Sequence, residues 1–100
     1  MIPIDSFVRL DKLSAQNKGI LPDVYWCKGF LASELKVGCT IIVQRTERAG
    51  REAGEPDVVK CAGLYVSSPV VEILENPDGS VTCRTHNSHW QITPLAQEKP

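Results

Sequence analysis

Alternation of hydrophobic and polar side chains with a period of two, the pattern of half-buried β-strands, organises several stretches of this chain. Residues 39–46 are the clearest example, because β-branched side chains dominate there. Residues 24–31 are rich in aromatic rings and equally extended in character. Residues 58–75 are nearly continuous in β character, with breaks at Gly63 and at Ser67-Ser68-Pro69, and predict one strand that turns a barrel corner. The pattern predicts a mostly β protein.

The segment Asn76-Pro77-Asp78-Gly79 predicts a β-hairpin. Pro77 suits the first central position of a type I turn, and Gly79 suits the left-handed residue of the bulge that follows. That turn also sets the register of the two flanking strands. The expected facing pairs are Asn76–Ser80, Ile73–Cys83, Val71–Thr85 and the opposite charges Glu72–Arg84.

The inward-facing positions change parity near the last predicted strand. They are odd-numbered up to Thr85 and even-numbered from Trp90 onward. A tight turn at His86-Asn87-Ser88 accounts for the change, and its composition suits one. We expect the segment from Thr85 to Trp90 to be the corner that lets the last strand close the barrel, with the side chains of Asn87 and Ser88 bonding to backbone.

The N-terminal segment 5–16 is compatible with two structures. A three-residue spacing of its apolar side chains suits a short amphipathic helix, whereas Phe7-Val8-Arg9-Leu10 suits an extra strand. We divide this single domain into an N-terminal extension (1–23), a barrel core (24–95) and a frayed tail (96–100). Within the core, residues 47–57 combine charge, glycine and proline and predict an exposed, mobile loop.

Three spaced motifs, together with the predicted strand through Arg45, carry a resemblance to a known group of proteins over roughly residues 24–95. They are Leu35-x-Val37-Gly38, Gly63-x-Tyr65-x-Ser67-Ser68-x-Val70-x-x-Ile73 and Thr85-x-Asn87-Ser88-x-Trp90-x-Ile92. The chain resembles small uncharacterised SH3-like β-barrel proteins of bacterial mobile elements and integron gene cassettes. That resemblance implies a single five-stranded antiparallel SH3-like barrel with a 3₁₀ turn before its last strand. Trp90 stands where the motif usually has tyrosine, and the loop 47–57 is longer than expected.

Composition narrows the range of partners and compartments. Eleven basic and twelve acidic residues give a net charge of −1, so no whole-molecule field steers the protein to nucleic acid or to a membrane. No apolar run is long enough to span a bilayer, and the N-terminal segment shows no export signal. The four cysteines form no CxxC pair and lie in apolar or alternating segments. We therefore expect a cytoplasmic protein with four reduced, largely buried thiols.

The candidate binding residues are aromatic rings and cations. They are Trp26, Lys28, Phe30, Arg45, Arg48, Arg51, Tyr65, Arg84 and Trp90. Trp26, Lys28 and Phe30 share one face of the predicted strand, although large apolar side chains of this kind pack into cores more often than they form binding platforms. The arginines around residues 45–51 lie among carboxylates that cancel most of their field.

Three functions fit these residues. The leading hypothesis is a non-enzymatic binding or adaptor module that acts through protein contacts, with a protein partner or by self-association. The first alternative is a small barrel that binds nucleic acid through the arginines and Trp90. The second is a metal-assisted hydrolase at His86 and His89, where HxH and HxxxH spacings are both absent. We assign no catalytic residue, no metal ligand, no cofactor and no membrane partner.

Overall fold

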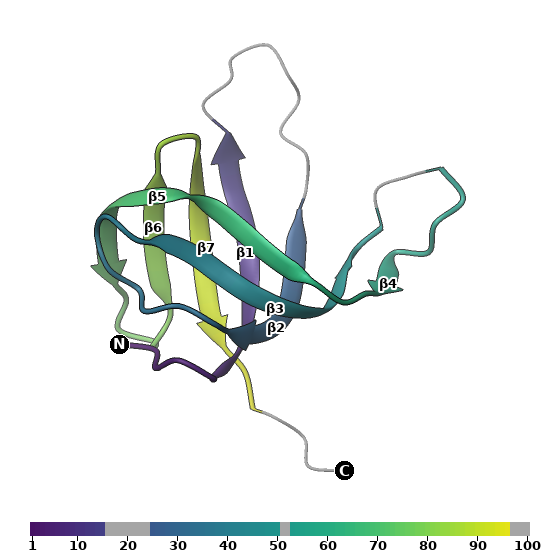
Figure 1. Cartoon of the computed structure of the whole chain (residues 1–100), viewed down its shortest axis with the longest axis horizontal. Coiled ribbons are helices and arrows are strands. Elements are labelled where there is room, and N and C mark those ends of the chain that lie inside the picture. Colours follow the sequence, from purple (N-terminus) through teal and green to yellow (C-terminus); the bar gives the residue numbers. More distant parts are fainter. Residues whose placement is uncertain (16–24, 51–52, 97–100) are drawn as a thin grey trace.

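The computed structural model describes residues 1–15, 25–50 and 53–96, and all the regular elements in these ranges are strands (Figure 1). In chain order the strands are β1 (Phe7–Ala15), β2 (Trp26–Leu31), β3 (Thr40–Ala49), β4 (Val58–Lys60), β5 (Leu64–Glu75), β6 (Val81–Thr85) and β7 (Ser88–Pro94). The predicted mostly β class is confirmed.

Six of the strands form a closed antiparallel barrel. The sheet order is β2-β1-β7-β6-β5-β3-β4, and an additional pairing of β2 with β3 closes it. The barrel therefore has six strands, one more than the five expected. The sixth is β1, which lies between β2 and β7 rather than outside the barrel as an extension. As a strand, residues 7–15 pair with β2 on one edge and β7 on the other, which satisfies their backbone groups and links the two strands in one sheet, as a helix could not.

The β3–β4 hairpin extends beyond the barrel (Figure 1). The expected loop 47–57 is shorter, because β3 continues to Ala49 and pairs with β4. The expected single strand 58–75 is two strands, separated by a turn at Cys61–Gly63. In the hairpin, Arg48 Nη2 lies 2.8 Å from Glu55 Oε2. Charges that suggested a solvated loop therefore join β3 to the segment that leads into β4.

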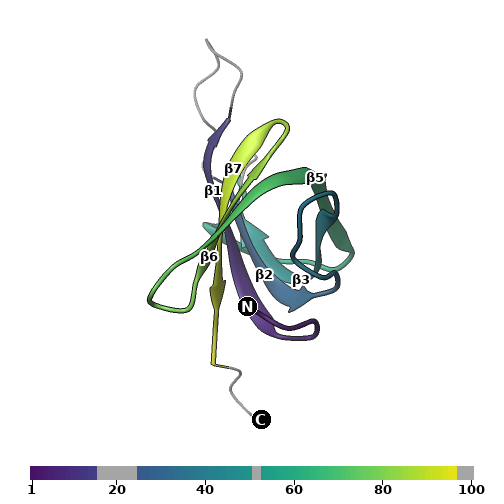
Figure 2. The same ribbon diagram turned by 90° about the vertical axis from the view of Figure 1, so that its left-hand side faces the viewer.

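The β5–β6 hairpin (Figure 2) largely follows its predicted register. The amide of Asn76 donates to the carbonyl of Ser80 at 2.9 Å, and Gly79 has the positive φ of 91° that its turn position requires. The pairs Ile73–Cys83 and Glu72–Arg84 are confirmed.

One predicted pair of this hairpin is wrong. Thr85 faces Val70 and not Val71, because the register shifts between Val70 and Glu72. A β-bulge of this kind bends its strand, and here it follows Pro69, at which β5 pairs with the start of β3. The bulge at the corner of the barrel therefore leaves Val71 unpaired with β6, which the sequence of the turn at Gly79 does not predict.

The connection between β6 and β7 is a two-residue turn at His86 and Asn87. Arg84 faces His89 without any irregularity, so the change in parity follows from the turn alone. The expected 3₁₀ turn is absent from this described segment. The expected bonds from Asn87 and Ser88 are also wrong: the Thr85 hydroxyl donates to the carbonyl of Ser88 at 3.2 Å, and the side chain of Asn87 is exposed.

The interior of the barrel holds one hydrophobic core. Its fully buried members include Val8, Leu10, Leu31, Ile41, Val43, Val81 and Ile92. Of the four cysteines, Cys27 and Cys83 belong to this core, whereas Cys39 and Cys61 are half-buried. Across the described ranges, no helix has the length and apolar character needed to cross a membrane.

Candidate functional site

The outer face of β1 and β2 carries a ladder of three cross-strand pairs. The pairs are Phe7–Phe30, Arg9–Lys28 and Asp11–Trp26. All six side chains are half-buried, while the alternate residues of β2 point into the barrel. The row of two cations is thus flanked by a pair of phenylalanine rings on one side and by a carboxylate and an indole on the other. We call these six residues the β1–β2 ladder.

The backbone brings the side chains of each ladder pair close together. Leu31 donates its amide to Ser6, and Lys12 donates its amide to Tyr25. In an antiparallel pair, hydrogen-bonded and non-hydrogen-bonded positions alternate, so the three ladder pairs occupy non-hydrogen-bonded positions. At such positions the facing Cα atoms lie about 4.5 Å apart, closer than at hydrogen-bonded ones.

Both cations of the ladder lie close to the indole ring of Trp26. The guanidinium carbon of Arg9 lies 4.6 Å from the centroid of the indole, and the ammonium of Lys28 lies 5.8 Å from it. Arg9 Nε also donates to both carboxylate oxygens of Asp11, at 3.0 and 3.1 Å. The guanidinium is therefore fixed by a ring and by a carboxylate, although the side chain remains 37% exposed.

The aromatic pair Phe7–Phe30 borders a hollow. The rings of Phe7 and Phe30 are tilted, with their centroids 5.3 Å apart. The hollow beside them has a volume of about 520 Å³. Its walls are Phe7, Lys28, Phe30, Thr46, Glu47, Leu95 and Ala96. Apolar rings and a cation thus border one cavity that is open to solvent and large enough for a side chain.

The close approach of β2 to β3 at this site depends on Gly29. A Cβ on this residue would lie 1.9 Å from the carbonyl oxygen of Gln44. The register between the strands shifts between Lys28 and Gly29, so the backbone bends there. The absence of a side chain at position 29 lets the strand that carries the ladder close the barrel.

The predicted aromatic candidates fall in two places. Trp26 and Phe30 are on the outer ladder with Lys28, and neither belongs to the core in which packing statistics would place them. Tyr65 and Trp90 point inward, with their ring centroids 5.4 Å apart. Trp90 is only 3% exposed, so its ring is unavailable for stacking against a base.

The predicted arginines do not gather into one basic surface. Arg48 is paired with Glu55, and Arg84 lies 3.6 Å from Glu72. Arg45 lies beside the buried Tyr25, with its Nη1 3.5 Å from the phenol oxygen. Arg51 lies outside the described residues. Of the described arginines proposed for nucleic acid, Arg45 and Arg48 lie on β3 and Arg84 lies on β6, and carboxylates pair with Arg48 and Arg84.

Two of the cysteines and a tyrosine have pKa values shifted by burial. Burial raises the pKa of the thiols of Cys27 and Cys83 to about 11, so both stay protonated at neutral pH and are poor nucleophiles. Burial also raises the pKa of Tyr25. Within the described ranges, no three His, Cys, Asp or Glu side chains gather closely enough to hold a metal ion.

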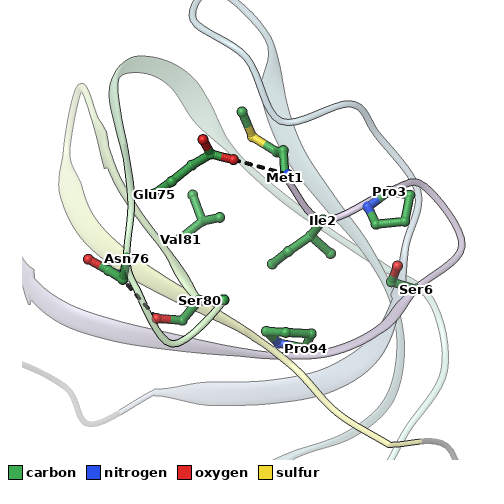
Figure 3. A pocket seen from close by; sticks show the side chains of 10 residues that line it. Met1, Ile2, Pro3, Ser6, Glu75, Asn76, Ser80, Val81 and Pro94 are labelled. Carbon is green, nitrogen blue, oxygen red and sulfur yellow. Dashed lines mark hydrogen bonds and ion pairs between the residues drawn. The ribbon is translucent and has the colours of Figure 1, made fainter.

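A second hollow, of about 310 Å³, lies at the end of the barrel beside the N-terminal segment. Ile2 points into it toward Val81 and Pro94 (Figure 3). Two of the polar side chains around it already have partners. The side-chain amide of Asn76 donates to Ser80 Oγ at 3.1 Å, and Glu75 lies 3.0 Å from the N-terminal ammonium.

Arg9, Phe7 and Asp11 belong to the ladder but were not predicted. The signal was available in Phe7-Val8-Arg9-Leu10-Asp11, where alternate residues share a face once the segment is a strand. The competing helical spacing of the same segment concealed it.

No family model, curated protein or solved structure matches this chain. The function is therefore argued from the site alone.

Proposed function

We propose that this protein is a non-enzymatic binding module that acts through protein contacts made by the β1–β2 ladder. The observation that carries the proposal is the stacking of Arg9 on the half-buried Trp26, beside the aromatic pair Phe7–Phe30. Tryptophan, arginine and phenylalanine are enriched where proteins bind one another, because each presents a large, rigid contact area.

Electrostatics favours a protein partner over a nucleic acid. The chain has a net charge of −1, and the ladder contributes only two cations, one of which is already paired with Asp11. Nucleic-acid affinity depends on several phosphates being neutralised together. Single-stranded nucleic acid remains the second candidate, because a ring flanked by cations also stacks bases.

The proposal is tested first by sedimentation velocity, since self-association is the simplest protein contact. We expect a concentration-dependent shift that Trp26→Ala abolishes and that Val66→Ala, at an exposed outer-face position of β5 away from the ladder, retains. A photo-crosslinking amino acid at position 28, irradiated in cells, extends the test to other partners. We expect one discrete adduct from position 28 and none from the exposed position 87.

A strict monomer that gives no adduct from position 28, with Trp26→Ala altering only stability, would overturn the proposal. Fluorescence polarisation with labelled single-stranded DNA and RNA at low salt tests the second candidate. Binding that weakens steeply as salt rises, and that requires Trp26, would favour nucleic acid instead.

We further propose that the barrel is related to the SH3-like proteins of bacterial mobile elements and integron cassettes, and that it resides in the cytoplasm. The motifs around Gly38, Ser67 and Trp90 support the relationship. Four free cysteines support a reducing compartment, because exposed and buried thiols alike persist there. The native gene neighbourhood and cell fractionation test the two points.

A further inference from the structure

We infer that the facing cations Arg9 and Lys28 form a site for a carboxylate, supplied by an acidic segment of a protein partner. The inference rests on the proposed function and names the chemistry of the partner. It predicts that an aspartate or glutamate side chain of the partner bridges the outward guanidinium nitrogens of Arg9 and the ammonium of Lys28.

The first observation is that two like charges face each other across β1 and β2. Arg9 and Lys28 are direct cross-strand partners at a non-hydrogen-bonded position, where side chains lie closest. Like charges placed in this way destabilise a sheet. Only Arg9 has a carboxylate partner, Asp11; among the described residues, Lys28 has none within ion-pair distance. An anion held between the two cations would relieve their repulsion.

The second observation is that Arg9 is oriented for recognition. Its Nε donates to Asp11, and its guanidinium carbon lies 4.6 Å from the centroid of the Trp26 ring. Its two Nη groups have no hydrogen-bond partner in the part of the chain that the structure describes. A guanidinium binds carboxylates through two parallel N–H groups, and holding it in place lowers the entropy lost on binding. The unpaired edge of Arg9 is therefore the preorganised one.

The third observation concerns the competing carboxylate nearby. Glu47 is the cross-strand partner of Lys28 on β3, yet its Oε1 lies 3.1 Å from the ammonium of Lys60. Lys28 instead lies beside Trp26 and on the wall of the hollow at Phe7 and Phe30. Lys28 thus has no ion pair among the described residues, although it lines the same hollow as the carboxylate of Glu47.

The spacing of the rows describes the partner segment. Phe7 and Arg9 are two positions apart on one strand, which separates the aromatic row from the cation row by about 7 Å. An extended segment with an acidic residue and an apolar residue at positions i and i+2 matches this distance, since its alternate side chains share a face. A single cation row suits one carboxylate better than the regular phosphates of a nucleic acid.

The test uses a synthetic decapeptide with serine at the odd positions and glutamate and valine in turn at the even ones, so that glutamate and valine stand at i and i+2 on one face. A matched peptide has glutamine in place of every glutamate. The readout is the ¹⁵N–¹H cross peak of the Trp26 indole Nε1, which lies beside both cations and is retained in every variant used with the peptides, followed at low salt. We expect a saturable shift with the glutamate peptide and none with the glutamine peptide. Arg9→Lys keeps the charge but loses the planar pair of donors, and should bind about tenfold more weakly. The matched control Arg84→Lys, on the outward face of β6, should bind like the wild type.

A second variant separates recognition from folding. Lys28→Gln removes one of the two cations that would bind the carboxylate, so it should abolish peptide binding. It also removes the repulsion between Arg9 and Lys28, so the melting temperature should stay constant or rise. A residue with a merely structural role would lower the melting temperature when replaced. Full binding by Arg9→Lys, or a loss of stability in Lys28→Gln, would overturn the inference. A shift produced by oligothymidine but not by the glutamate peptide would also overturn it.

The outcome is distinguishable from failure of the proposed function. If self-association or crosslinking from position 28 persists in Arg9→Lys, and is lost in Trp26→Ala, the ladder is a protein-binding surface that does not recognise a carboxylate. If both variants retain every protein contact, the proposed function fails as well.

Discussion

The indole Nε1 of Trp90 donates a hydrogen bond to Oγ1 of Thr85 over 3.3 Å, in the interior of the barrel. The same hydroxyl donates to the carbonyl of Ser88 at 3.2 Å. One buried side chain on β6 thus satisfies a polar group of the core and a backbone group of the turn. Trp90 in turn packs edge-on against Tyr25 and Tyr65, with centroids 6.3 and 5.4 Å away.

Replacing Thr85 with valine should destabilise the barrel although the shape of the side chain is retained. The variant leaves the indole N–H of Trp90 buried without an acceptor, at a cost of about 1–3 kcal/mol. Urea denaturation followed by tryptophan fluorescence measures the loss. Thr93→Val, on the outer face of β7, is the matched control and should change stability little. Equal stability of the two variants would show that the hydrogen bond contributes nothing.

Replacing glycine with alanine should have very different effects at positions 29 and 79. Gly29→Ala places a Cβ 1.9 Å from the backbone oxygen of Gln44, so β2 must move away from β3. We expect a loss of about 3 kcal/mol or more, or failure to fold. Gly79→Ala meets open space, and the left-handed backbone alone costs about 1–2 kcal/mol. Thermal denaturation of both variants tests the order, which a less stable Gly79→Ala would reverse.

Stability should fall in alkaline solution because of the two buried thiols. Burial holds the pKa of Cys27 and Cys83 at about 11, above the ordinary value of 9.0. Below pH 8 both thiols are protonated whether the chain is folded or not, and their contribution is complete. Between pH 9 and 11 only the unfolded chain loses these protons, so unfolding becomes easier by up to about 1.4 kcal/mol per thiol per pH unit.

The pH effect is measured from urea midpoints between pH 7 and 11. Lysine and tyrosine residues also titrate in this range, so the control is the double variant Cys27→Ala/Cys83→Ala. This variant should be less stable overall, because it leaves cavities, but its stability should depend less on pH. Identical slopes for the two proteins would contradict the assignment.

Thiol labelling should divide the cysteines into two pairs. Cys39 and Cys61 are half-buried, whereas the side chains of Cys27 and Cys83 are fully buried. We expect a disulfide reagent at neutral pH to modify two thiols quickly in the native protein and all four in denaturant. Cys39→Ser and Cys61→Ser should each remove one rapid equivalent. Four rapid equivalents in the native protein would mean that the barrel opens readily.

The hairpin and the ladder illustrate how far a sequence can be interpreted. The turn at 76–79 is determined by its local sequence, because proline fixes φ at one position and glycine permits the positive φ that another position needs. The pairs next to it therefore followed correctly, as far as Glu72–Arg84. Val71 was placed wrongly because the bulge serves the corner of the barrel, which depends on the pairing of Thr40 with Pro69.

The candidate binding residues were predicted only in part, again because tertiary pairing decides what local alternation leaves open. Alternation along one strand correctly placed Trp26, Lys28 and Phe30 on a common face, but alternation does not say whether that face is inside or outside. Trp90 was treated as a possible surface residue and lies in the core. Arg9, which completes the strongest site, was missed because its partner Lys28 is distant in the chain.

The sequence by itself determined the β class, the hairpin at 76–79 and the change of parity before Trp90. Each depends on backbone preferences and side-chain alternation within a few residues. Only the tertiary structure decided that β1 is a barrel strand, that six strands close the barrel, and that Arg9 faces Lys28 above Trp26. Those outcomes depend on pairing between segments far apart in the chain, where the hydrogen bonds and apolar burial gained on closure outweigh local preference.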